Sequence, residues 1–347
     1  MKTVSLNDAL KRVSLFLFQD ELNRKHMSVK VNNAVAQIGS MLHRPLREDD
    51  YINFNDGKRF RFSFRCAEHY RANSFYGIAP SIKKYSGYKK KINGCIEHGL
   101  YLGDYYNPYE AVNSGLPWVF TMSEARRTVL NKYGSKQVAV LGPYIQYAER
   151  NEGFEACLRR ELNSGGTLLV FPTHSIETIS IHRNLERFIS QVDEAKRAFG
   201  LSNVIVNLYF MDIDSETVKR LRDNGFVVTC CGNRTDPLFL SRQRSLIEIA
   251  DVTCSDGFGT HIGYALSCST PHFVFGSDAS ASTSMCDISA HVYLNAEQQR
   301  IELEKLFAER TDSISEEQMS AASHFWGVGM HLSSSELLLL LERAEYD

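Results

Sequence analysis

The sequence predicts an α/β protein in two halves, each with a parallel β-sheet flanked by helices. The first observation is that short apolar runs alternate with segments of helical spacing between residues 92 and 276. The second is that glycines and small polar residues separate these runs, as at the turns that join strands to helices. The chain has 347 residues, enough for two domains, which we place at residues 1–150 and 151–347.

The first half begins with helices and contains few strands. Apolar residues recur at a period near 3.6 from Leu6 to Gln37 and from Val29 to Met41, which indicates helices. Phenylalanines alternate with arginines within Tyr51–Cys66, a pattern typical of a half-exposed strand. Residues 73–91 predict an irregular loop rich in Gly, Lys and Tyr. We expect a helix that Ser123 caps, and buried strands at Ile92–Ile96, Leu116–Phe120 and Val138–Leu141.

The second half alternates strands and helices regularly. Strands are expected at Thr167–Phe171, Val204–Phe210, Phe226–Cys230, Ile249–Val252 and His272–Phe275. Helices are expected at Arg183–Phe199, at Ser215–Asn224 with Ser215 as its cap, at Leu238–Ile249 and from Thr260 onward. Such alternation predicts a parallel sheet with helices on both faces. A polar loop at residues 277–284 and charged helices from Ala296 to the end complete the chain.

Composition excludes several classes of protein. The formal net charge of -2 gives no electrostatic case for binding nucleic acid. No apolar run reaches the length that crosses a bilayer, and the N-terminal region carries acids that a signal peptide lacks. The 8 cysteines lack the spacing of metal ligands, so we expect reduced thiols, no bound metal and a cytoplasmic protein. Peripheral contact with the inner face of a membrane stays open.

The turn from Ser255 to His261 is the strongest candidate for a ligand site. Gly257 and Gly259 let the backbone turn sharply and let a ligand approach the main chain. Thr260 is placed to cap the following helix, whose free N–H groups attract phosphates. Every α/β sheet needs such turns, and most bind nothing. The polar donors of Ser255, Thr260 and His261 favour the binding site over that simpler interpretation.

Polar residues also follow other expected strands, where ligands of open α/β sheets bind. The second half offers two groups of candidates, one of them with Glu177 nearby: Thr173, His174 and Ser175, and Gly232, Asn233 and Arg234. In the first half, Glu97 and His98 follow a strand. A histidine at that place suits general-base catalysis, since its ordinary pKa lies near neutrality. The alternative is that His98 is an ordinary core or loop histidine.

These motifs, in this order, resemble the GT-B glycosyltransferases that build bacterial surface polysaccharides of the capsule or O-antigen type. The resemblance covers Ile92 to Gly276 and rests on Glu97-His98-Gly99, on Ser114-Gly115-Leu116-Pro117, and on the turn Ser255–His261 before Gly263-Tyr264-Ala265-Leu266. It implies two Rossmann-like domains that face a cleft, the N-terminal one reduced or rearranged, because the chain begins with helices.

The resemblance also implies roles for these residues. His98, or Glu97 beside it, is the expected base on the acceptor side. The donor-binding residues are the three groups that follow strands of the second half, with Glu177. Such enzymes need no metal and no cofactor beyond the nucleotide-sugar.

Three functions stay open from the sequence. The first is an inverting, metal-independent glycosyltransferase that moves a sugar from a nucleotide-sugar to a saccharide or lipid-linked acceptor. The second is a non-hydrolysing nucleotide-sugar 2-epimerase, which requires several acids and histidines around one sugar. The third is a non-catalytic nucleotide-binding protein. The identities of the sugar, the nucleotide and the acceptor do not follow from the residues.

Overall fold

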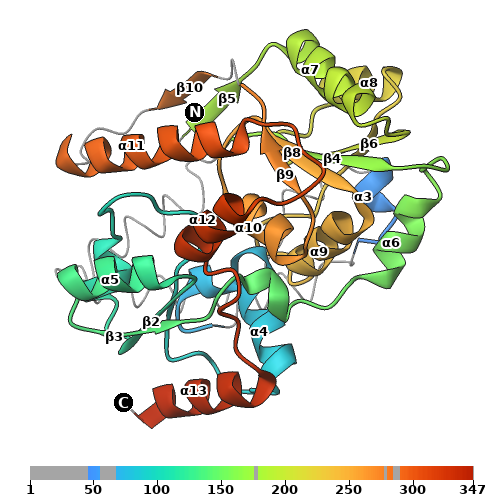
Figure 1. Ribbon diagram of the computed structural model, residues 1–347. Coiled ribbons are helices and arrows are strands. Elements are labelled where there is room, and N and C mark those ends of the chain that lie inside the picture. Colours follow the sequence, from blue (N-terminus) through green and yellow to red (C-terminus); the bar gives the residue numbers. More distant parts are fainter. Residues whose placement is uncertain (1–45, 55–67, 176–178, 277–279, 284–289, 347) are drawn as a thin grey trace, which may run out of the picture.

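The computed structural model describes residues 46–54, 68–175, 179–276, 280–283 and 290–346. Two parallel sheets with flanking helices form the two halves of the molecule (Figure 1), so the predicted α/β class is confirmed. The helices expected before residue 42, and the strand expected within Tyr51–Cys66 beyond Phe54, lie outside the described residues.

The first half is built on a small sheet. Its strands are β1 (Gly94–Ile96), β2 (Trp118–Thr121) and β3 (Gln137–Val140), parallel and in that order. Helix α5 (Glu124–Tyr133) connects β2 to β3, and the Ser123 side chain accepts a hydrogen bond from the Arg126 N–H, which is the predicted cap. Within the described part of the chain this sheet has three strands, in agreement with a reduced N-terminal half.

The second half holds the larger sheet, with strand order β7-β6-β4-β8-β9, all parallel. Its strands are β4 (Thr167–Phe171), β6 (Asn203–Asn207), β7 (Val227–Thr229), β8 (Val252–Ser255) and β9 (His272–Val274). The chain leaves β4 toward β6 and β7 and later returns to its other side as β8. The turns after β4 and β8 are therefore neighbours at the point where the strand order reverses, the usual ligand-binding position in such sheets.

Successive side chains of β4 point to opposite faces of this sheet, and both faces are apolar, so helices cover both. Leu168 and Val170 pack in one core with residues of α7 (Leu185–Ala198) and α8 (Ser215–Asp223). Leu169 packs in the other core with residues of α6 (Glu152–Arg159), α9 (Phe239–Ile249) and α10 (Thr260–Ser267). Figure 1 shows α7 and α8 on one side of the sheet, with α9 and α10 on the other.

The second of these cores continues into the first half, so the two halves share apolar side chains. It includes Trp118 and Phe120 of β2, Tyr144 and Ile145 of η4 (Tyr144–Tyr147), and Trp326 of α12 (Glu316–Trp326). Helix α12 packs on α10, where a Cβ on Gly263 would lie 2.2 Å from the Trp326 Cγ. Glycine at this position lets the two helices approach each other.

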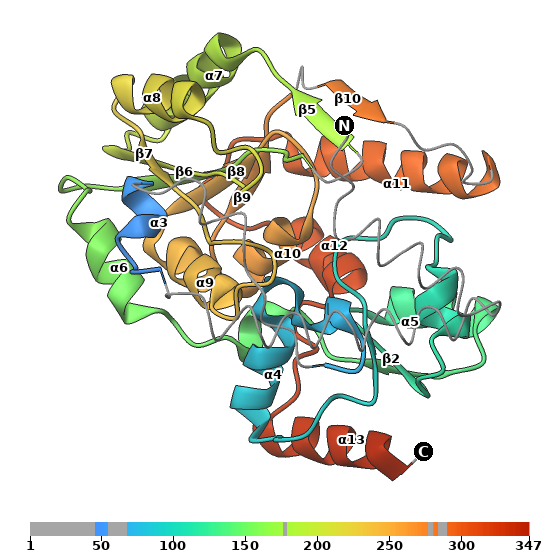
Figure 2. The same cartoon turned by 180° about the vertical axis from the view of Figure 1, so that it is seen from behind.

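Both described ends of the chain lie against the distant half. Helix α13 (Ser334–Tyr346) packs on α4 of the first half, whereas α3 (Asp50–Asn53) packs on β7 of the second, as Figures 1 and 2 show. The division at residue 150 stays a prediction. Among the described residues, none of the helices, of which α11 (Ala290–Phe307) has 18 residues, is long and apolar enough to cross a membrane.

Four local predictions were wrong. Residues 73–91, expected as a loop, form η2 (Arg71–Gly77) and α4 (Ile78–Ser86), and the expected polar loop after residue 276 contains β10 (Ser280–Thr283), antiparallel to β5 (Ile179–His182). Asp214, not Ser215, caps α8. Gly259 is the N-cap of α10, so Thr260 is its first helical residue.

Candidate active site

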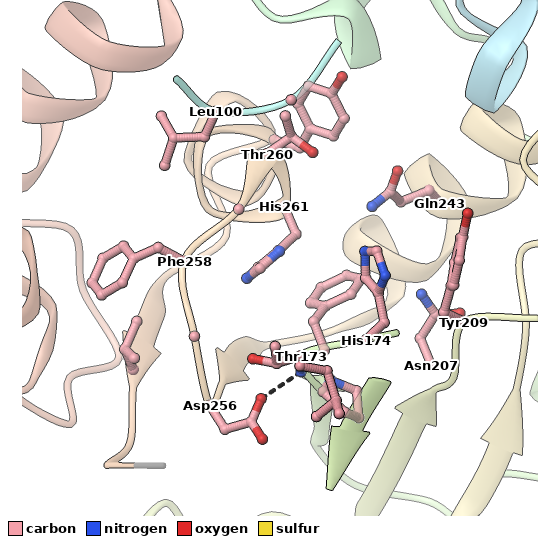
Figure 3. Close-up of a pocket in the computed structure, with 18 of the residues that line it drawn as sticks. Leu100, Thr173, His174, Asn207, Tyr209, Gln243, Asp256, Phe258, Thr260 and His261 are labelled. Carbon is pink, nitrogen blue, oxygen red and sulfur yellow. Dashed lines mark hydrogen bonds between the residues drawn. The ribbon is translucent and has the colours of Figure 1, made fainter. Parts of the chain in front are cut away.

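A cavity of about 1170 Å³ lies between the two halves, at the carboxyl ends of both sheets. The first half contributes Tyr76, His98, Gly99, Leu100 and Leu102, among others. The second half contributes the turns after β4, β6 and β8 and the residues Arg300 and Glu304 of α11. Figure 3 shows Phe258, Thr260 and His261 on one wall of this cavity, opposite His174, Tyr209 and Gln243.

The turn between β8 and α10 lines the cavity, as the sequence predicted. Gly257, Gly259, Thr260 and His261 are all lining residues. The N-cap of α10 is Gly259, which has no side chain to cap the helix. Its first N–H groups and the positive end of its dipole are therefore available to an anionic group.

Gly259 is needed for space and not for backbone conformation. Its φ of -170° is extended backbone that any residue adopts. A Cβ at this position would lie 2.8 Å from Nδ1 and 2.9 Å from Cε1 of His261. Glycine therefore leaves room for the imidazole of His261.

His261 has a buried ring nitrogen without a partner. Its ring stacks on Phe171 at 5.1 Å between centroids, and within the described part of the chain Nε2 has no hydrogen-bond partner. Burial, and secondarily the nearby His174, lowers the pKa of His261 to about 3, so the imidazole is neutral near pH 7. A buried polar atom without a partner at a cavity wall is a place where a ligand atom is expected.

The turn after β4 brings Thr173 and His174 to the cavity but not Ser175. The His174 ring lies 4.2 Å from the Tyr209 ring. Ser175 serves the fold instead, because its N–H donates to Asp212 Oδ2 and its Oγ accepts a hydrogen bond from the Ile181 N–H. Glu177 lies outside the described residues.

Asp256 lines the cavity beside this turn and is paired with an arginine. Its Oδ2 lies 2.5 Å from Nη1 of Arg183, and its Oδ1 accepts the Thr173 N–H at 2.5 Å. The other carboxylate among the described lining residues, Glu304, is paired with Arg300. The described residues include no group of three or more His, Cys, Asp or Glu side chains placed to hold a metal ion.

His98 reaches the cavity from the end of β1. Its ring packs edge-on against Phe75 at 5.2 Å and lies 5.9 Å from the Tyr76 ring. Nδ1 is buried and has no partner among the described residues. Burial, and secondarily the charge of Arg234, lowers the pKa of His98 to about 4, so this imidazole is also neutral near pH 7.

Glu97 points away from the cavity. It is 2% exposed, and its carboxylate accepts hydrogen bonds from Arg126 Nη2 at 2.6 Å and from the Thr121 hydroxyl at 2.7 Å. Glu97 is not among the residues that line the cavity. The structure thus separates the two candidate bases: His98 faces the cavity, and Glu97 belongs to a buried ion pair.

Five predicted donor-binding residues do not line the cavity: Ser175, described above, and Ser255, Gly232, Asn233 and Arg234. Ser255 is fully buried, donates to the Gly257 carbonyl at 2.7 Å and lies 3.0 Å from Nε2 of His272. These contacts hold the turn between β8 and α10 in place. The carbonyl of Arg234 accepts the Tyr76 N–H, so that turn packs against the first half.

Several residues at the site gave no signal in the sequence. Gln243 is in the middle of α9, and Asn207 ends β6. Arg183 and His272 do not line the cavity, yet they contact Asp256 and Ser255, which belong to the turn before α10. Nothing in the local pattern marks these residues, because their role depends on which strands become neighbours.

No protein-family model and no curated protein match the chain. Solved structures with similar arrangements include the wall teichoic acid polymerase TagF, with 10% sequence identity and a TM-score of 0.39 over 72% of this chain and 66% of that one. The UDP-GlcNAc 2-epimerase of Neisseria meningitidis, bound to UDP-GlcNAc, has 15% identity and a TM-score of 0.38 over 78% and 73%. A family 9 glycosyl transferase of Veillonella parvula has 13% identity and a TM-score of 0.30 over 80% and 81%.

Proposed function

We propose that this protein is an inverting, metal-independent glycosyltransferase that moves a sugar from a nucleotide-sugar to a hydroxyl group of a saccharide or lipid-linked acceptor. The observation that carries the proposal is the pairing of two features in one cavity. On the second half, the N-terminus of α10 begins at Gly259, and the buried Nε2 of His261 has no partner among the described residues. On the first half, His98 lines the cavity, and its buried Nδ1 also lacks a partner in the described part of the chain.

The first feature suits the leaving diphosphate. When the bond between the sugar and the diphosphate breaks, negative charge develops on the leaving oxygen. Backbone N–H groups and the dipole of α10, which are fixed before the reaction, stabilise that charge. The neutral ring of His261 lies at the same wall, where Nε2 can accept a hydrogen bond from a hydroxyl group of the donor sugar.

The second feature suits the acceptor. The acceptor oxygen forms a bond to the anomeric carbon and loses its proton to His98, while the nucleoside diphosphate departs with the bonding electrons. Burial keeps His98 unprotonated near pH 7, so its ring nitrogen is available to accept a proton. Attack from the face opposite the leaving group gives inversion at the anomeric carbon.

The carboxylates support this function over the epimerase. An epimerase requires acid and base groups around one sugar, but both carboxylates among the described lining residues are already paired, Asp256 with Arg183 and Glu304 with Arg300. In the described residues, no group of three or more His, Cys, Asp or Glu side chains is placed to hold a divalent cation. We therefore propose that the N-terminus of α10 stabilises the leaving group, with no cofactor besides the nucleotide-sugar.

The test is incubation of the pure protein with a panel of nucleotide-sugars, with and without EDTA. Release of nucleoside diphosphate by transfer or slow hydrolysis, unchanged by EDTA, is the expected result. Formation of the 2-epimer would replace the proposal with an epimerase. Binding of a nucleotide without any turnover would leave a nucleotide-binding protein.

A further inference from the structure

The turn that lines the proposed phosphate site carries a carboxylate. Asp256 precedes Gly257, is 6% exposed and lines the cavity. A free negative charge here would repel a diphosphate, and the repulsion would be strong because the surroundings have a low dielectric constant. Asp256 therefore works against the proposed ligand unless its charge is compensated.

Arg183, which follows β5, supplies that compensation. Its Nη1 lies 2.5 Å from Oδ2 of Asp256, and its Nη2 donates to the carbonyl of Thr173. The guanidinium lies 5.1 Å from the centre of the Phe188 ring, and its side chain is 17% exposed. A planar group held by two polar contacts and one ring is well fixed in place.

The same contacts join the two turns of the site. Oδ1 of Asp256 accepts the Thr173 N–H, the bond drawn as a dashed line in Figure 3, while Arg183 holds Oδ2 and the Thr173 carbonyl. Both oxygens of Asp256 are therefore engaged, and the carboxylate is held by the turn after β4 and by Arg183.

We propose that Arg183 is a positioning residue for the donor diphosphate. It allows the diphosphate to bind because it compensates the charge of Asp256 and holds the turns after β4 and β8 in place. This inference rests on the proposed function, since it needs a diphosphate at the N-terminus of α10. Arg183 does not line the cavity, so it acts through Asp256 and not by contact with the ligand.

The experiment is calorimetric binding of inorganic pyrophosphate and of a panel of nucleoside diphosphates to the full chain. Arg183→Met leaves Asp256 unpaired, and we expect affinity to fall at least about tenfold. In the double variant Arg183→Met with Asp256→Asn, the asparagine oxygen still accepts the Thr173 N–H and no charge remains. We expect it to recover affinity to within about threefold of the natural protein.

Two further variants keep the test decisive. Asp256→Asn alone leaves Arg183 as a net positive charge near the site, and we expect equal or tighter binding. The matched control is Arg220→Met, which removes an arginine from the exposed pair with Glu186 and should change nothing. Thermal melting and circular dichroism report whether each variant is folded.

The outcomes separate this inference from the proposed function. If the natural protein binds none of these diphosphates, the proposed function fails, and the role of Arg183 fails with it. If the natural protein binds them but folded Arg183→Met binds equally well, only the inference is overturned. A double variant as weak as Arg183→Met, or weaker binding by Asp256→Asn alone, also overturns it, because charge would then not be the cause.

Discussion

Gly259→Ala tests the donor site with the smallest possible change. The new Cβ would lie 2.8 Å from Nδ1 of His261, whereas ordinary contacts begin near 3.4 Å, so the ring must move by roughly 0.6 Å. That shift stretches a hydrogen bond of about 2.9 Å to about 3.5 Å, which is the limit of such a bond. Loss of one hydrogen bond between neutral groups costs about 0.5–1.5 kcal/mol. We therefore expect the nucleotide-sugar to bind about 2-fold to 10-fold more weakly.

The fold should survive this substitution, because the extended backbone at residue 259 suits alanine and the new methyl group meets only a side chain. The matched control is Gly276→Ala. Gly276 lines the same cavity, and a Cβ there has no neighbour within 4 Å. Calorimetry on both variants, with melting curves, gives the answer. Unchanged affinity for the nucleotide-sugar in Gly259→Ala would refute the contact between His261 and the donor.

Three further predictions follow from the same geometry. His98→Ala should lower kcat by about 10²–10⁴-fold while the Kd of the donor stays unchanged, since the donor is held by the other half; wild-type turnover in this variant would remove His98 as the base. The pKa values of His98 and His261 are lowered to about 4 and about 3, so unfolded chains bind more protons below pH 6.5. Each histidine should therefore reduce the free energy of unfolding by about 2 kcal/mol between pH 7 and pH 5, and denaturant titrations that are flat over this range would contradict it. Gly263→Ala should lower the melting temperature, because its Cβ would lie 2.2 Å from Trp326 Cγ and overpacking costs about 1–3 kcal/mol; a melting temperature equal to that of Gly276→Ala would show that the two helices adjust.

Strand β4 could be predicted from the sequence because it is an apolar run between turn residues and is buried along its whole length. The strand expected at Ile249–Val252 is found three residues later, as β8 (Val252–Ser255), because Ile249 still belongs to α9 and β8 is buried although it contains Thr253 and Ser255. Helix α4 escaped prediction because Pro80 and the neighbouring lysines suggested a loop. Pro80 lies in the first turn of α4, where its missing N–H breaks no helical hydrogen bond. Strand β10 has the sequence Ser-Ala-Ser-Thr, which carries no apolar pattern.

Some residues of the candidate site could also be predicted from the sequence, and others could not. His174 and His261 could be predicted because each follows a strand, and parallel strands end at one edge of their sheet. Ser175 and Ser255 follow or end such strands too, but their side chains bond to the fold beneath the cavity. The periodicity of the sequence predicts which residues lie near the carboxyl edge of the sheet. It does not predict which of their side chains form hydrogen bonds within the fold, since those bonds depend on contacts between distant segments.

The buried ion pair between Glu97 and Arg126 fixes the backbone next to His98, the proposed base. Side chains of adjacent residues at a strand end point to opposite sides, so one residue turned into the interior places the next at the cavity. Glu97 is held through its carboxylate by Arg126, its N–H donates to the Phe120 carbonyl, and its own carbonyl accepts the Tyr144 hydroxyl at 2.7 Å. These bonds fix the backbone immediately before His98. A base with an otherwise unpartnered ring nitrogen needs such support, because a displacement of about 1 Å is enough to lower a rate by about 10²-fold. Under the proposed function, Glu97 is therefore the anchor that positions His98, while its own carboxylate stays paired with Arg126.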